Sequence, residues 1–289
     1  MGVLTFKSPH IEKRVRERLK TLEPLTLTQE DLLQIECISI SESYIGDIRC
    51  TAIIRIWDTE MSSYFCAYSW MSLNLDYREL IKTDGWEEDL KYFSHIHTFY
   101  CDAQIPPELF YYFTNLENLG LSNINISDWS FLLGFQILYT VSLDKCGSEG
   151  NQAIKNICEL YAAQKEKGKN KVRPEDIPLV SFVAVIGMGV NDLSPFKRLG
   201  EPFATSADLC ELNLSNNAIS DISPLSGFRI DTLILNDNTI SRREEDLAVA
   251  ERLLAAERAR LASTRGYTVD EFQNNMRDAI KKGANAHAE

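Results

Sequence analysis

The residues that come nearest to a metal-binding pattern are His95 and His97, with Cys101 and Asp102 shortly after them. Alternate residues of a strand project to one face, so two imidazoles spaced in this way would point in the same direction. Metal sites normally use three or four protein ligands, and no second Cys/His pair accompanies these residues in the sequence. The pattern therefore favours ordinary strand residues, and neither a metal nor a cofactor is expected.

The other catalytic patterns in the sequence are incomplete. Gly187-Met-Gly189 follows an apolar run, but the third glycine of a dinucleotide-binding loop is absent. None of the four histidines stands beside a serine or cysteine in a known nucleophile motif. The two glycines are thus expected to form a turn, and the chain is expected not to be an enzyme. An undetected enzyme within residues 51–92 is the alternative.

Composition and charge narrow the classes of partner. The formal net charge of −12 disfavours a nucleic-acid partner, because such proteins usually present a basic face to phosphate. The basic cluster from Lys165 to Arg173 contains no aromatic residue for base stacking and is expected to be a solvated connector. Seven scattered cysteines without CxxC spacing fit buried thiols in a reducing compartment. With no signal peptide and no bilayer-length apolar run, a cytoplasmic protein without membrane contact is expected.

A repeated spacing of apolar residues organises most of the chain. It is clearest at 209–219 and recurs 21 residues later at 230–240. Weaker copies are built on Ile35, Ile38 and Ile40; Ile96, Phe99 and Cys101; Leu116, Leu119 and Leu121; Leu138, Val141 and Leu143; and Val180, Val183 and Val185. Apolar residues two apart on a strand point to one side, and one short unit cannot cover them alone. The units are therefore expected to stack, with their strands joined in a parallel sheet.

The two clearest copies also share an asparagine after the strand, Asn217 and Asn238. Its amide can hydrogen-bond backbone groups where the chain turns away from the sheet. At Ile124, Cys146 and Met188 the asparagine is missing, as it is at Ser43, so those turns are expected to be less regular.

These residues resemble the internalin-like class of bacterial leucine-rich repeats, and the resemblance extends to the segment before the repeats. That segment looks like the helical cap that precedes the first repeat in this class. Ile11, Val15 and Leu19 share one helical face, and Thr28 lies three residues before Asp31, as at the start of a short helix. The resemblance implies an α/β solenoid of leucine-rich repeats with a parallel β-sheet, an N-terminal helical cap and C-terminal helices.

The domain organisation follows from these patterns. The N-terminal helical cap is assigned to residues 1–33, the leucine-rich-repeat solenoid to 34–240 and a C-terminal helical tail to 241–289. Insertions interrupt the solenoid at 51–92, which fits either a hairpin or degenerate repeats, and at 147–179. The second insertion is expected to hold an amphipathic helix whose apolar face is formed by Ile154, Ile157, Cys158 and Tyr161.

A solenoid of this kind offers a broad sheet face for binding, formed by the residues between the buried ones. That face is mostly small and polar, with apolar side chains among the polar ones, which suits a protein partner because desolvated anchors carry most binding energy. A non-enzymatic protein-binding scaffold is therefore the leading interpretation, and the alternative is that an insertion covers this face. The candidate binding residues on the last strands are Phe182, Ile186, Glu211, Asn213, Thr232, Ile234 and Asn236.

The tail beyond residue 257 resembles the toxin-binding end of type II antitoxins of bacterial toxin–antitoxin systems. The resemblance implies an antitoxin-like inhibitor that neutralises a small, basic toxin protein by laying apolar side chains in its grooves. The anchors carried over to this sequence would be Leu254, Leu261, Tyr267, Phe272, Met276 and Ile280. The DNA-binding domain usual in that family is missing, so operator binding is not implied. The alternative is that these helices cap the last repeat.

Overall fold

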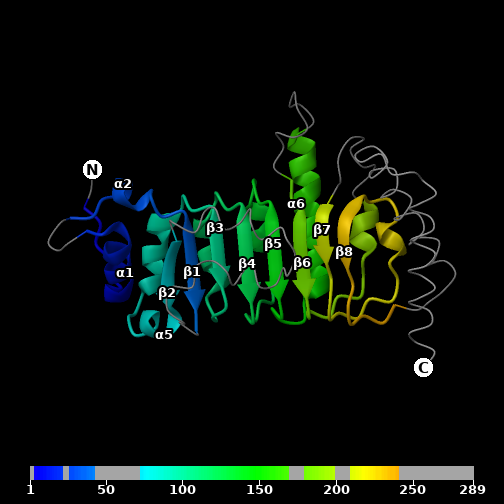
Figure 1. Ribbon diagram of the computed structural model, residues 1–289, viewed down its shortest axis with the longest axis horizontal. Coiled ribbons are helices and arrows are strands. Elements are labelled where there is room, and N and C mark those ends of the chain that lie inside the picture. The colour runs from blue at the N-terminus through cyan, green and yellow to red at the C-terminus, as the bar shows by residue number, and fades with distance from the viewer. Residues whose placement is uncertain (1–2, 22–25, 43–71, 169–178, 199–208, 241–289) are drawn as a thin grey trace, which may run out of the picture.

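The computed structural model describes residues 3–21, 26–42, 72–168, 179–198 and 209–240. Within them eight parallel strands form one sheet, with the connecting helices gathered on one side of it (Figure 1). The strands are β1 (Cys37–Ser41), β2 (Ser72–Asp76), β3 (Thr98–Cys101), β4 (Asn118–Ser122), β5 (Thr140–Asp144), β6 (Phe182–Ile186), β7 (Leu209–Asn213) and β8 (Ile230–Ile234). The α-helices are α1 (Pro9–Leu19), α2 (Gln29–Leu32), α5 (Tyr77–Leu80) and α6 (Gly150–Gly168). The 3-10 helices are η2 (Trp86–Phe93), η3 (Pro107–Tyr112), η4 (Ser130–Gly134), η6 (Ser194–Arg198) and η7 (Ser223–Leu225).

The core follows the predicted repeat spacing. One apolar residue from each strand lies in a continuous cross-strand row, and the row is Leu73, Ile38, Phe99, Leu119, Val141, Val183, Leu212 and Leu233. All but Leu233 at the end of the sheet are at most 1% exposed. Behind the sheet, stacked rings link neighbouring units, as at Phe110 and Phe131, whose centroids are 4.4 Å apart. The predicted stacking of units into a parallel sheet is confirmed.

The turns after β4 to β8 share one position with positive φ. Each places a residue with positive φ, between 52° and 63°, four positions after its core residue, and these are Asn123, Lys145, Gly187, Asn216 and Asp237. The expectation of less regular turns is therefore wrong at Ile124. It is correct at Cys146 and Met188, where Gly147 (φ 91°) and Gly189 (φ 71°) add a second positive φ that the turns with Asn217 and Asn238 lack. The expectation at Ser43 lies outside the described residues.

The asparagine after the strand acts as predicted. Asn217 Oδ1 accepts hydrogen bonds from the backbone N–H groups of Met188 and Val190, both at 3.0 Å. Its Nδ2 donates to carbonyls of Val185, at 2.6 Å, and Leu214, at 2.9 Å. The side chain thus joins the turns of two consecutive units.

The order of strands departs from a simple solenoid at the N-terminal end. The sheet runs β2-β1-β3-β4-β5-β6-β7-β8, so β2 pairs with the outer side of β1 rather than lying between β1 and β3. Residues 72–92 of the first insertion therefore supply an edge strand, followed by α5 and most of η2. The hairpin and degenerate-repeat alternatives for 51–71 lie outside the described residues.

The second insertion contains the expected helix. In α6, the predicted apolar residues Ile154, Ile157, Cys158 and Tyr161 are all buried. Figure 1 shows α6 behind the sheet and projecting beyond the ends of the strands. The C-terminal part of the basic connector, from residue 169, is outside the described residues.

The N-terminal helices form as predicted, but α1 packs against the edge strand β2 instead of the first repeat strand. Ile11 and Val15 are fully buried, and Leu19 packs against the same core. Asp31 Oδ2 accepts hydrogen bonds from the backbone N–H and the hydroxyl of Thr28, at 2.7 and 2.8 Å, which fixes the start of α2. The end of the sheet that α1 lies against is thus formed by the insertion.

Candidate functional site

The candidate binding residues lie on the side of the sheet opposite the core, which we call the outward face. Its positions alternate along each strand with the buried row. Phe182, Glu211 and Thr232 are neighbours in the strand register, and so are Ala184, Asn213 and Ile234. The structure therefore brings the predicted residues of β6, β7 and β8 together on one continuous surface.

The predicted exposure of this surface is only partly correct. Thr232 and Asn236 are exposed, and Phe182 and Ile234 are half-buried.

The expectation is wrong for Ile186, Glu211 and Asn213, which are 9%, 8% and 6% exposed. The Asn213 side chain is held against the sheet because its Oδ1 accepts hydrogen bonds from the backbone N–H and the hydroxyl of Ser215, at 3.1 and 2.8 Å. Glu211 stands directly beside the Phe182 ring in the register. Ile186 is paired with Asp144 on the neighbouring strand.

Thr140, Phe182 and Glu211 form a row of three adjacent side chains, here named the Glu211 cluster. Thr140 is 3% exposed, and its Oγ1 has no hydrogen-bond partner among the described residues. Glu211 Oε1 is likewise buried without a partner in the described part of the chain. Burial raises the pKa of the Glu211 carboxyl to about 7. Tyr139 packs against the Phe182 ring with centroids 5.3 Å apart.

A second set of carboxylates follows the C-terminal ends of the first strands. Asp76, Asp102 and Asp144 alternate across the sheet with Ser41 and Ser122. The Ser41 hydroxyl donates to Asp102 Oδ2 at 2.9 Å, and the Ser122 hydroxyl donates to Asp144 Oδ2 at 3.4 Å. No outward position of the described strands is a lysine or arginine. Asp76 is paired with Arg78 at 2.9 Å, and the remaining carboxylates, Asp102, Asp144 and Glu211, make the described part of the outward face acidic.

His95 and His97, whose spacing resembled that of metal ligands, lie in the segment before β3. A His95 ring nitrogen lies 2.9 Å from the Leu32 carbonyl oxygen and 3.0 Å from that of Ile35, while His97 is exposed. Both precede β3, so the expectation that they lie on a strand is wrong. In the described ranges, no group of three or more His, Cys, Asp or Glu side chains is placed to hold a metal ion.

The described thiols are poorly suited to nucleophilic chemistry. Cys146 and Cys158 are buried, and burial raises their pKa to about 11 and about 12. They are therefore protonated near neutral pH, whereas the thiolate is the reactive form.

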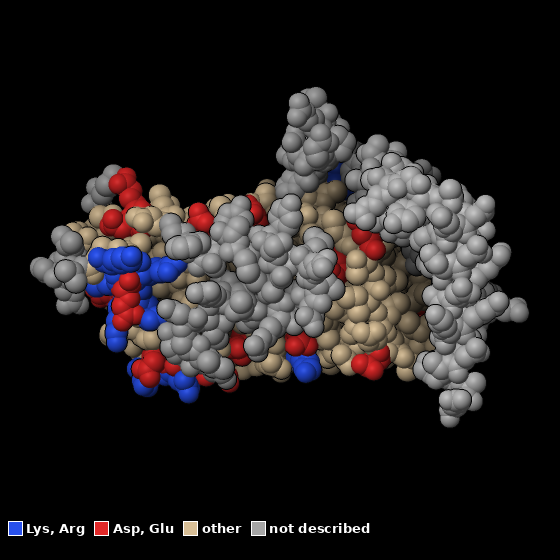
Figure 2. Space-filling view, in the orientation of Figure 1, with Lys and Arg blue, Asp and Glu red and all other residues tan. Residues whose placement is uncertain are grey.

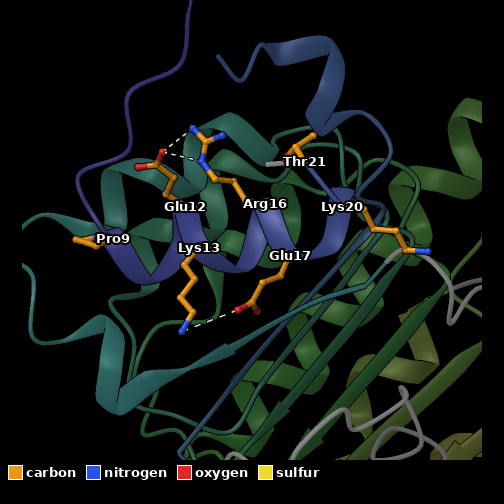
Figure 3. A pocket seen from close by; sticks show the side chains of 7 residues that line it. All are labelled: Pro9, Glu12, Lys13, Arg16, Glu17, Lys20 and Thr21. Carbon is orange, nitrogen blue, oxygen red and sulfur yellow. Dashed lines mark hydrogen bonds and ion pairs between the residues drawn. The ribbon is translucent and has the colours of Figure 1, made fainter. Parts of the chain in front are cut away.

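The outer face of α1 carries a groove of about 490 Å³ (Figure 3). Ion pairs cross it from Arg16 to Glu12, at 2.8 Å, and from Lys13 to Glu17, at 3.9 Å. Figure 2 shows that basic side chains gather at this end of the molecule. Because its lining is mainly charged and paired, the groove is a solvated helix face rather than an apolar ligand pocket.

The described helices include none that is long and apolar enough to span a membrane. The tail anchors Leu254, Leu261, Tyr267, Phe272, Met276 and Ile280 lie outside the described residues.

The sequence analysis did not predict the strand β2 or the row of aspartates formed by Asp76, Asp102 and Asp144. The signal was present, because Ser72-Leu-Asn-Leu-Asp76 has the same pattern as Thr140-Val-Ser-Leu-Asp144, with two core residues two apart and an aspartate after them. A search for this shorter pattern would have found both.

The register, the buried rows and the shared turns define a solenoid of leucine-rich-repeat type. No protein-family model and no curated protein matches the sequence. Among solved structures, internalin C2 from Listeria monocytogenes strain 4b F2365 is 16% identical, with a TM-score of 0.49 over 86% of this chain and 90% of that one. A second internalin from that strain is 18% identical, with a TM-score of 0.45 over 86% of this chain and 61% of that one.

Proposed function

We propose that this chain is a non-enzymatic, cytoplasmic protein-binding scaffold whose partner docks on the outward face across β6, β7 and β8. The observation that carries the proposal is the Glu211 cluster, where two buried polar atoms without partners among the described residues flank an aromatic ring. Leaving such an atom unpaired costs about 1–3 kcal/mol, which a partner that supplies the missing hydrogen bonds would recover.

The surroundings of the cluster suit a protein better than a small molecule. Thr232 and Ile234 extend the surface onto β8. Thr232 is exposed, and Ile234 is half-buried. Aromatic side chains are enriched at protein–protein interfaces, where they act as anchors surrounded by contacts that exclude water. The flat array of parallel strands also presents side chains at regular spacing, as an extended partner surface requires.

The test is capture of partners from the source organism by the full chain carrying one substitution at a time. Ile234→Arg alters the outward face, and Leu133→Arg alters η4 on the helical side, where Leu133 is 45% exposed. Both change the net charge equally. We expect a stoichiometric protein to be retained by the wild type and Leu133→Arg, and reduced at least about tenfold by Ile234→Arg. Equal retention by the two variants, or no stoichiometric protein with the wild type, would refute the proposal.

The antitoxin-like inhibitor remains a separate prediction, supported by the sequence of the tail. In the same capture experiment, Phe272→Asp and Met276→Asp would abolish retention of a small basic protein if the tail binds it. Retention unchanged by both substitutions would remove this alternative.

A further inference from the structure

We infer that the Glu211 cluster receives a lysine or arginine side chain from a basic segment of the protein partner. The inference rests on the proposed function and adds the chemistry of the group that is recognised. Three properties of the described residues support it: the unpaired carboxyl, the ring beside it and the charge of the surrounding face.

The carboxyl oxygen is the first of these. Glu211 Oε1 is buried without a partner among the described residues, and the ionised carboxylate, which a neighbouring cation favours, offers only acceptor positions. The group that satisfies it must therefore donate a hydrogen bond. A cationic donor is favoured over a neutral one, because hydrogen bonds between ionised groups are about twice as strong as those between neutral groups.

The Phe182 ring is the second. It lies next to Glu211 in the register, and the Tyr139 ring packs against it at an interplanar angle of 62°. The face of an aromatic ring attracts a cation by its quadrupole, most strongly where water is excluded. On the other side of Phe182, the Thr140 hydroxyl supplies a further acceptor without a partner among the described residues. Carboxyl, ring and hydroxyl together match the long apolar stem and donor head of lysine or arginine.

Access to the cluster comes from the β8 side. Thr232, the neighbour of Glu211 on β8, is exposed and has a short side chain. The Phe182 ring on the opposite side is half-buried. A side chain approaching over β8 thus reaches the carboxyl before it reaches the ring.

The charge of the outward face is the third property. Asp102 and Asp144 continue the acidic surface toward the N-terminal strands, and the outward positions of the described strands include no lysine or arginine. Since the whole chain carries a formal net charge of −12, an acidic partner would be repelled. Charge complementarity therefore selects a basic segment as the occupant.

The experiment titrates the full chain with a hexa-arginine peptide at about 150 mM salt, where long-range attraction is screened. Glu211→Gln removes the carboxyl charge and keeps its shape. Glu108→Gln makes the same charge change at an exposed residue of η3. We expect Glu211→Gln to raise the Kd at least about fivefold and Glu108→Gln to leave it within about 1.5-fold.

A second variant separates the ring from the charge. Phe182→Leu retains an apolar side chain but removes the aromatic face, and we expect it to raise the Kd about threefold. Thermal melting of each variant establishes that it is folded. Equal weakening by Glu211→Gln and Glu108→Gln would show attraction by net charge alone and overturn the inference, as would equal binding of hexa-glutamate.

The failure of this inference can be told from failure of the proposed function. If the captured partner depends on Ile234 but Glu211→Gln does not weaken it, protein binding on the outward face stands and the cationic-group inference falls. If capture does not depend on Ile234, the proposed function itself is wrong.

Discussion

His10 Nε2 accepts a hydrogen bond from the backbone N–H of Asp76 over 3.2 Å, at the outer edge of β2. One helical turn later, Arg14 Nε donates to the carbonyl oxygen of Asn74 at 3.0 Å. Four residues of helix and two of strand both advance about 6 Å, so α1 can satisfy alternate groups of the edge from its side chains. An unpaired strand edge promotes association with other chains, and α1 covers part of this one.

The hydrogen bond that His10 accepts from Asp76 predicts that the stability of the fold depends on pH. Burial, followed by the charge of Arg14, lowers the pKa of His10 below its ordinary 6.5, so the folded state holds the neutral, accepting imidazole. The unfolded chain binds the proton first as pH falls. The free energy of unfolding should therefore be retained above about pH 6.5 and decrease below it.

Denaturation by urea between pH 8 and about pH 5 measures this contribution as the difference between wild type and His10→Gln, which keeps an acceptor but does not titrate. We expect the wild type to lose stability relative to His10→Gln as pH falls. His97→Gln, which removes an exposed histidine, is the control. The same pH response in both variants would contradict the assignment.

The carboxyl of Glu211 predicts the opposite dependence of the free energy of unfolding on pH. Its pKa is raised from 4.5 to about 7 by burial, so the folded state retains a proton that the unfolded chain releases. Its contribution to the free energy of unfolding is present below pH 4.5 and is lost as pH rises toward about 7. Glu211→Gln should thus match the wild type near pH 4.5 and exceed it at pH 8 by about 1–3 kcal/mol. Parallel stability curves for the two proteins would contradict a buried, unpaired carboxyl.

The strands could be predicted from the sequence because alternation of side chains is a local property. Phe99 and Cys101, for example, were identified from spacing alone and form β3 as expected. The place of β2 could not be predicted in this way. Consecutive strands usually pair with one another, and the return from β2 across β1 to β3 depends on contacts far apart in sequence.

The burial of the candidate site was equally hidden. Repeat spacing places Thr140, Phe182 and Glu211 each directly before a core residue, and so in one row of the outward face, but it does not reveal how deeply each side chain is buried. Whether a carboxyl at such a position is solvated depends on how far the side chains of its cross-strand neighbours extend from the sheet. The unpaired state of Glu211 became visible only in the assembled sheet.

Asn217→Ala should be among the most damaging single substitutions in the solenoid. The amide is 9% exposed and joins backbone groups of two turns, which would all lose a partner together. We expect a loss of about 2–4 kcal/mol in the free energy of unfolding, measured by urea denaturation. Asn238→Ala removes the corresponding but half-buried amide and should cost about half as much. An equal or larger loss at Asn238 would show that burial does not set the cost.

Cys146→Asn should stabilise the protein, because Cys146 occupies the position after β5 that Asn217 occupies after β7. Its Sγ donates to the Asp144 carbonyl at 3.4 Å and takes a hydrogen bond from the backbone of Ile124. An amide of similar volume can make both bonds more strongly, and we expect a gain of about 1 kcal/mol in the free energy of unfolding. The matched control, Cys158→Asn, places the same amide against the apolar core on α6 and should destabilise. Destabilisation by both substitutions would mean that an asparagine in the turn after β5 cannot make the hydrogen bonds that Asn217 makes after β7.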